Sequence, residues 1–125
     1  MLRINAPFEP RPGGFEAFFH AGSLEFPNAE RERLLAICRQ VPTIVVLFCD
    51  RPAIVPEIAA AAAALWVEFG ARDDAVVDVL LGHAHARGRL PFDLPSSTAA
   101  VVASRSDVAF DTADPVFRFG DGLQT

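Results

Sequence analysis

A single continuous apolar run, Thr43-Ile44-Val45-Val46-Leu47-Phe48-Cys49, constrains the fold of this chain more than any other feature. β-Branched and apolar residues without polar alternation are typical of a strand buried on both faces, as in parallel sheets covered by helices. Residues 2–5 and 65–70 predict two further strands. We therefore expect an α/β fold in which the apolar run is the central strand.

Helical patterns fill the intervals between these strands. Apolar residues at helical spacing predict helices over residues 28–40 and 73–81. The alanine-rich stretch 54–64 predicts another helix, and residues 97–103 a shorter one. Residues 90–94 predict one more strand. Alternating strands and helices imply right-handed parallel crossovers. The expected fold is a three-layer α/β/α sandwich, flavodoxin-like or Rossmann-like, with about four mainly parallel strands.

Size and charge narrow the function classes. With 125 residues, the chain is expected to form one domain over residues 1–125, built around one core. Its net charge of -5 argues against binding to nucleic acid or to anionic lipid, because both are bound by clusters of Lys and Arg. No apolar run approaches the ~18 residues of a membrane span. The first residues lack a signal-peptide pattern, so we expect a cytoplasmic location.

The two cysteines are expected to be free thiols. Cys38 falls within a predicted helix and Cys49 at the end of the central strand, where single cysteines are usually buried. A disulfide between them is the alternative.

Four motifs follow one another in a fixed order: Asp50-Arg51-Pro52, Val79-Leu80-Leu81-Gly82, Gly88-Arg89-Leu90-Pro91-Phe92-Asp93-Leu94-Pro95 and Phe117-Arg118-Phe119-Gly120-Asp121-Gly122-Leu123. In this order the chain resembles the second, C-terminal domain of family 3 glycoside hydrolases, and the resemblance covers nearly its whole length. It departs from the family at Asp50, where the family has glycine. The catalytic barrel and the first elements of the family's second domain have no counterpart, so the resemblance implies a truncated domain.

The resemblance implies glycoside hydrolysis, which in retaining enzymes needs two carboxylates about 5 Å apart. In this family the nucleophile is a barrel aspartate, and many members carry the acid/base glutamate on a loop of the second domain. Glu9, on the proline- and glycine-rich loop after the first strand, is therefore the candidate acid/base, and Glu16 and Glu25 are weaker candidates. Alternatively, Glu9 is a solvated loop carboxylate, since some members keep the acid/base on the barrel.

Other polar residues carry less specific patterns. Arg51 follows the central strand at the sheet edge where α/β folds place ligands, so it is a candidate substrate-binding residue. The alternative is that Arg51 pairs with a nearby carboxylate and fixes a loop. His83 and His85 near Asp78 lack further ligands for a metal, and we expect no metal and no cofactor.

Partners follow from the same resemblance. We expect the domain to work with a family 3 catalytic barrel on a carbohydrate substrate, and to be inactive alone because the nucleophile is missing. An unpaired sheet edge predicts a homo-oligomer of the isolated chain. A barrel or a second copy is expected to cover the aromatic residues of the long loop, Phe8, Phe15, Phe18, Phe19 and Phe26. Two other functions stay open: a non-catalytic interaction domain and a sugar-binding module.

Overall fold

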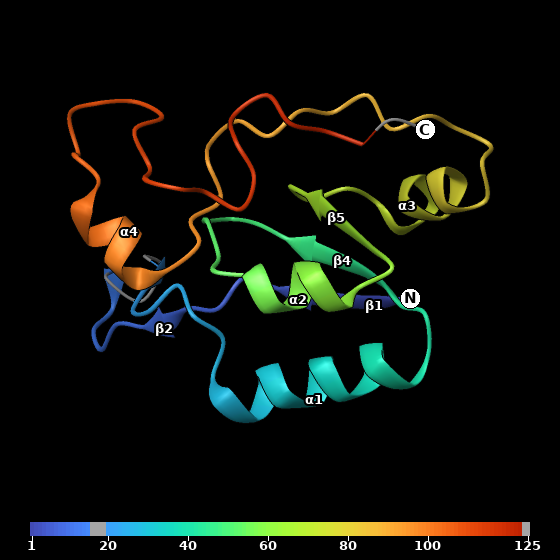
Figure 1. Ribbon diagram of the computed structural model, residues 1–125, viewed down its shortest axis with the longest axis horizontal. Helices are drawn as coiled ribbons and strands as arrows, with labels where there is room; N and C mark the ends of the chain where they lie inside the picture. The colour runs from blue at the N-terminus through green and yellow to red at the C-terminus, as the bar shows by residue number, and fades with distance from the viewer. Residues whose placement is uncertain (16–19, 124–125) are drawn as a thin grey trace.

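The computed structural model describes residues 1–15 and 20–123 and has an α/β fold (Figure 1). Its parallel sheet contains β1 (Leu2–Asn5), β4 (Ile44–Phe48) and β5 (Ala64–Glu68), in the order β1-β4-β5. Val45 of β4 pairs with Leu2 on one side and with Leu65 on the other. The apolar run therefore forms the central strand, as the sequence predicts.

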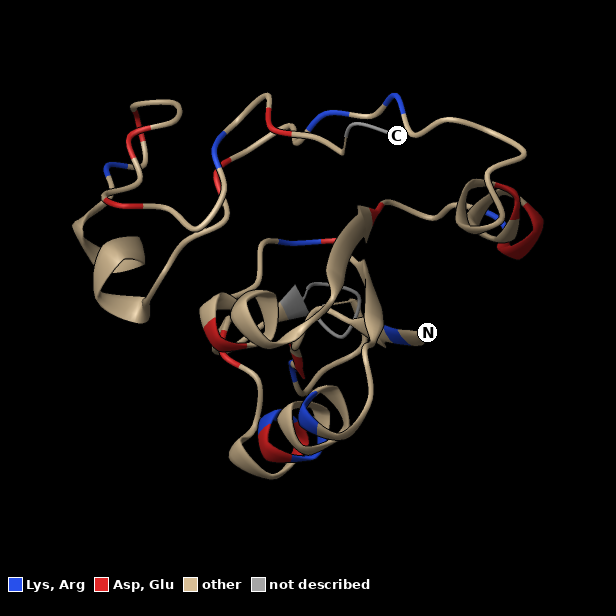
Figure 2. Ribbon diagram, turned by 45° about the vertical axis from the view of Figure 1, so that its right-hand side comes forward, with Lys and Arg blue, Asp and Glu red and all other residues tan. Residues whose placement is uncertain are grey.

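The helices follow the predicted order. They are α1 (Asn28–Gln40), α2 (Pro56–Ala61), α3 (Asp73–Leu80) and α4 (Thr98–Ala103). Pro56 opens α2 and the chain enters β5 soon afterwards, so this helix is shorter than predicted. Figures 1 and 2 show α3 to one side of the sheet, and Figure 2 shows acidic residues at its start. Among the described residues, no helix has the length and apolar character to cross a membrane.

One face of the sheet, here called the apolar face, carries the core. Side chains alternate between the faces of a strand, so Ile4, Val45 and Leu47 point to the same side. They form one buried cluster with residues of α1 and α2: Leu34, Leu35, Cys38 and Ile58. Leu34 and Leu47 are completely buried. Burial of these side chains supplies the main driving force for folding.

The opposite face, here called the Arg3 face, is spanned by a charged side chain. Arg3 of β1 reaches across β4, and its Nη2 donates to Glu68 Oε1 at the end of β5 at 2.7 Å. The same nitrogen donates to the carbonyl of Ala71 at 3.0 Å, and Nη1 donates to Asp73 at the start of α3. Val46 shares this face and is 1% exposed. The guanidinium therefore links both edge strands and α3.

The predicted strand at residues 90–94 is wrong. Leu94 forms an isolated antiparallel bridge with Phe117, and the flanking Pro91 and Pro95 have no N–H to donate to a ladder. The parallel sheet consequently has three strands rather than about four. The other two strands of the described chain, β2 (Glu9–Pro10) and β3 (His20–Ala21), form a separate antiparallel pair.

Both cysteines are free and buried, as predicted. Cys49 follows β4 and is 2% exposed. Burial raises the pKa of its thiol to about 12, and the negative charges of Asp50 and Glu68 add to the effect. The Cys49 thiol is therefore unreactive, because it stays protonated at neutral pH.

Candidate functional site

Glu9 lies on the two-stranded ribbon formed by β2 and β3. Beyond β1 the chain stays attached to the sheet at Ala6, whose amide donates to the carbonyl of Phe48 at 2.8 Å. It then enters β2, where Glu9 pairs with Ala21 and Pro10 with His20. The Glu9 side chain is exposed. The ribbon therefore presents a carboxylate to solvent near the carboxyl end of the parallel sheet.

Arg51 fixes the same ribbon to the sheet. It follows β4 and is half-buried. Its Nη1 donates to the carbonyl of Ala21 at 2.6 Å, and its Nη2 donates to the carbonyl of Gly22 at 2.8 Å. The structure thus brings the two candidates to one place, because Ala21 is the residue that pairs with Glu9. Arg51 thus fixes a loop, as in the alternative, but through two backbone carbonyls rather than a carboxylate. Its contact with substrate stays a prediction.

Gly22 completes this arrangement, and sequence reasoning missed it. Its φ of +82° lies in the left-handed region, which favours glycine. A Cβ at Gly22 would lie between 2.5 and 2.8 Å from side-chain carbons of Glu9, far closer than van der Waals contact. The Glu9 side chain therefore lies directly against Gly22. Only the fold reveals this, since an Ala-Gly-Ser sequence says nothing about what the glycine faces.

The weaker carboxylate candidates do not join this group in the described chain. Glu25 is bridged to Ile54 and accepts a hydrogen bond from the Thr98 hydroxyl at 2.5 Å, so it ties the start of α4 to the preceding chain. Glu16 lies outside the described residues.

The histidines after α3 lie on the surface. Nδ1 of His83 is 3.5 Å from a carboxylate oxygen of Asp78, and both side chains are exposed. Within residues 1–15 and 20–123, no group of three or more His, Cys, Asp and Glu side chains could hold a metal ion.

The aromatic residues of the long loop divide into two groups. Phe26 is 6% exposed and belongs to the core, so the prediction of an external cover for it is wrong. Phe8 and Phe15 are 47% and 74% exposed. Phe18 and Phe19 lie outside the described residues.

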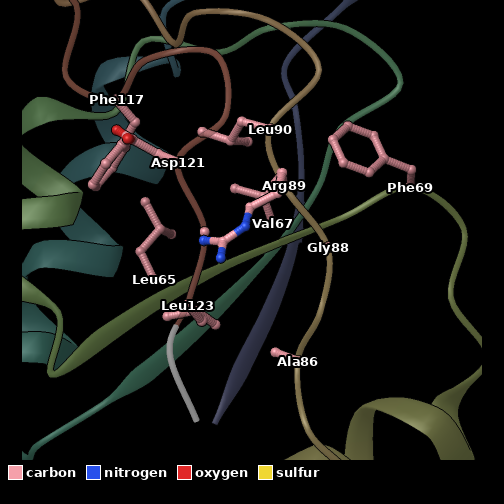
Figure 3. Close-up of a pocket in the computed structure, with 11 residues that line it drawn as sticks. Leu65, Val67, Phe69, Ala86, Gly88, Arg89, Leu90, Phe117, Asp121 and Leu123 are labelled. Carbon is pink, nitrogen blue, oxygen red and sulfur yellow. The ribbon is translucent and has the colours of Figure 1, made fainter.

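A cavity of about 410 Å³ lies between β5 and the last segments of the chain (Figure 3). Leu65 and Val67 form one wall, and Figure 3 shows the Arg89 guanidinium lying among these apolar side chains. Asp121 is the one carboxylate among the described lining residues. Because retaining hydrolysis requires a pair of carboxylates, this cavity cannot perform the reaction by itself.

The same cavity is bordered by the two C-terminal motifs, which run side by side. The amide of Leu90 donates to the carbonyl of Asp121 at 2.8 Å, and the amide of Gly120 donates to the carbonyl of Leu90 at 2.9 Å. Gly122 allows the close approach, because a Cβ there would lie 2.5 Å from the carbonyl oxygen of Gly88. The amide of Phe119 donates to buried Asp93 at 2.7 Å. Each of the two motifs therefore supplies hydrogen-bond partners to the other.

The model of the glycosyl hydrolase family 3 C-terminal domain matches residues 15–125. This chain belongs to that family. It is 54% identical over 98% of its length to the probable beta-glucosidase C of Aspergillus flavus, and 49% identical over 99% to the beta-glucosidase C of Emericella nidulans. It is 34% identical over 98% to the periplasmic beta-glucosidase/beta-xylosidase of Dickeya chrysanthemi. No solved structure matches the chain.

This family 3 domain spans only part of the length of these relatives. It covers 19% of the Aspergillus flavus protein and 20% of the Emericella nidulans protein. The family match confirms the resemblance drawn from the four motifs. In this family 3 domain, the motifs from Gly88 and from Phe117 serve packing and backbone pairing, whereas Arg51 holds the ribbon that carries Glu9.

Proposed function

We propose that this family 3 domain works as part of a β-glucosidase-like glycoside hydrolase, together with a catalytic barrel. In that role it forms a wall of the sugar site and supplies Glu9 as general acid/base. The proposal is supported by the hydrogen bonds from Arg51 to the carbonyls of Ala21 and Gly22. Because Ala21 pairs with Glu9, these bonds hold the exposed Glu9 near the carboxyl end of the sheet. α/β folds place ligands at this edge. The names of the relatives support a terminal β-linked glucose or a related sugar as substrate.

The chemistry requires two steps. In the first, the Glu9 carboxyl gives its proton to the glycosidic oxygen, the bond from that oxygen to the sugar breaks, and a barrel carboxylate bonds to the anomeric carbon. In the second, the Glu9 carboxylate takes a proton from water, whose oxygen bonds to the anomeric carbon and displaces the barrel carboxylate. Since the family nucleophile belongs to the barrel, the chain alone cannot turn over substrate.

The test is reconstitution. The purified chain is mixed with the separately produced remainder of the Aspergillus flavus relative, and hydrolysis of nitrophenyl β-glucoside is measured. We expect turnover by the mixture and none by the chain alone. Glu9→Gln lowers kcat of the mixture by about 10² to 10⁴, the usual contribution of general acid/base catalysis. Glu25→Gln is the matched control and keeps the activity. Binding without turnover, or turnover by the chain alone, contradicts the proposal.

We also propose, as a second function, that the isolated domain associates with itself. Two observations favour this. Among the described residues, β1 and β5 pair only with β4, so both present an outer edge. Phe15 is 74% exposed. Unpaired edges and exposed aromatic side chains both favour contact with another chain.

Light scattering tests this second proposal. We expect the mass of a dimer or a larger species, and a shift toward the monomer in Phe15→Ser. A monomer at all concentrations contradicts self-association.

A further inference from the structure

We propose that Arg51 and Gly22 set the position of the Glu9 carboxyl group, so that Arg51 is a positioning residue and not a ligand of the sugar. This inference rests on the proposed function of Glu9. It goes further because it assigns the placement of the acid/base to two residues outside the strand that carries it.

Arg51 is suited to this role by its shape. A guanidinium presents several N–H groups in a rigid plane, so one side chain can satisfy two neighbouring carbonyls at the same time. Arg51 does this with Ala21 and Gly22 at 2.6 and 2.8 Å. A lysine ammonium is a point donor on a flexible stem and does not reproduce the planar contact.

The ribbon depends on such a contact because it is very short. β2 and β3 contain two residues each, and a two-stranded hairpin is at best marginally stable in water. The bonds from Arg51 attach β3 to the end of β4, where the amide of Cys49 donates to the carbonyl of Glu68 at 2.9 Å. Since Glu9 pairs with Ala21, the rigid sheet determines where the Glu9 backbone lies.

Gly22 then determines where the Glu9 side chain lies. The carboxyl carbon, Cγ and Cβ of Glu9 occupy the space that a Cβ at position 22 would need. Gly22→Ala would have to move the Glu9 side chain and would strain a backbone with φ of +82°. The backbone of Glu9 is thus held through Arg51, and its side chain rests on Gly22.

The decisive experiment compares leaving groups in the reconstituted mixture. Methyl β-glucoside has a poor leaving group that needs the proton from Glu9, whereas dinitrophenyl β-glucoside has a good one that does not. We expect Arg51→Met and Gly22→Ala to lower kcat for the methyl glucoside about 10- to 100-fold, as for a misplaced catalytic group. The first-step rate for the dinitrophenyl glucoside, measured as kcat/KM, changes little, whereas its kcat falls because the second step needs Glu9 as base. Arg51→Lys gives an intermediate loss.

The outcomes separate this inference from the proposed function. If Glu9→Gln shows no dependence on the leaving group, the proposed function fails whatever Arg51 does. If Glu9→Gln shows the dependence and Arg51→Met does not, only the inference is overturned. Two further results overturn it. A rise in KM with unchanged kcat indicates direct sugar binding by Arg51. Equal losses in kcat/KM on both substrates indicate general support of the fold.

A second readout needs no activity. In the chain alone, Arg51→Met should speed amide hydrogen exchange at Ala21 and Gly22, while the Cys49 thiol, 2% exposed, stays protected from alkylation. Arg33→Met is the matched control, since Arg33 pairs with Glu30 on the surface of α1 at 2.7 Å and should change neither signal. Unchanged exchange at Ala21 in Arg51→Met overturns the inference.

Discussion

The two faces of the parallel sheet are closed by different physical means. On the apolar face, Val45 and Leu47 are completely buried against α1 and α2. On the Arg3 face, Val46 is 1% exposed and shares its side of the sheet with Arg3, whose guanidinium bonds to Glu68 and Ala71. Apolar burial does not depend on pH, whereas an ion pair does.

This difference shows how a small domain can connect its parts. The apolar face supplies a close-packed core, in which the loss of a few methyl groups is costly. The Arg3 face supplies directional contacts that join β1, the end of β5 and the start of α3. The ribbon with Glu9 is held in a similar directional way by Arg51. In both places the rigid sheet holds a neighbouring segment through a few polar contacts.

The largest expected effect is on the apolar face. Leu47→Ala removes a completely buried side chain from the core and leaves a cavity, which should lower the free energy of unfolding by about 2–5 kcal/mol. Urea denaturation followed by circular dichroism measures the change. Val102→Ala is the control, since Val102 is 80% exposed and its truncation should change stability by less than about 0.5 kcal/mol. Equal effects of the two variants would contradict the assigned core.

A smaller, pH-dependent effect is expected on the Arg3 face. Burial of Glu68 opposes its ionisation, but hydrogen bonds from Arg3 and from the amides of Ala71 and Gly70 outweigh it and hold its pKa below the usual 4.5. Glu68 therefore stabilises the fold above pH 4.5, and this contribution disappears as pH falls below that value through the lower pKa of the folded state. Glu68→Gln should cost about 2 kcal/mol at neutral pH.

The measurement is the free energy of unfolding as a function of pH. Glu68→Gln should have a flatter curve than the parent chain below pH 4.5, the usual pKa of the residue that it replaces. A curve parallel to that of the parent chain at all pH values would show that the Arg3 contact does not contribute to acid sensitivity.

The smallest effect is expected from a similar ion pair outside both faces. The hydrogen bond from Arg33 lowers the pKa of Glu30, but this i,i+3 pair lies on the surface of α1, where water and salt screen it. Glu30→Gln should change the free energy of unfolding by less than about 0.5 kcal/mol. A loss as large as that of Glu68→Gln would remove the distinction between the Arg3 face and an ordinary surface pair.

Much of the secondary structure could be predicted, because the patterns that indicate strands and helices lie within short stretches of sequence. The apolar run at 43–49 identified the central strand, and helical spacing identified α1, α3 and α4. The strand predicted at 90–94 is wrong because Pro91 and Pro95 have no N–H to donate, which leaves Leu94 with only an isolated bridge to Phe117. Phe117, which pairs with Leu94, is distant from it in the sequence.

The candidate site was predicted only in part. Glu9 and Arg51 were selected separately, one from a family resemblance and one from its place after a strand. Their connection through Ala21 and the contact of Glu9 with Gly22 depend on segments that meet only in the fold. Nothing in the local sequence around Gly22 indicates a neighbouring carboxylate.

The sequence by itself determined the three strands of the parallel sheet, the order of the helices and the family that the chain resembles, because these follow from short-range patterns and ordered motifs. The tertiary structure alone decided which polar groups meet. Arg3 crosses the sheet to Glu68, and Arg51 reaches back to the ribbon that carries Glu9. Such contacts depend on chain segments that are brought together by burial of the core, and the direction of a long side chain across a sheet is not encoded by its neighbours in sequence.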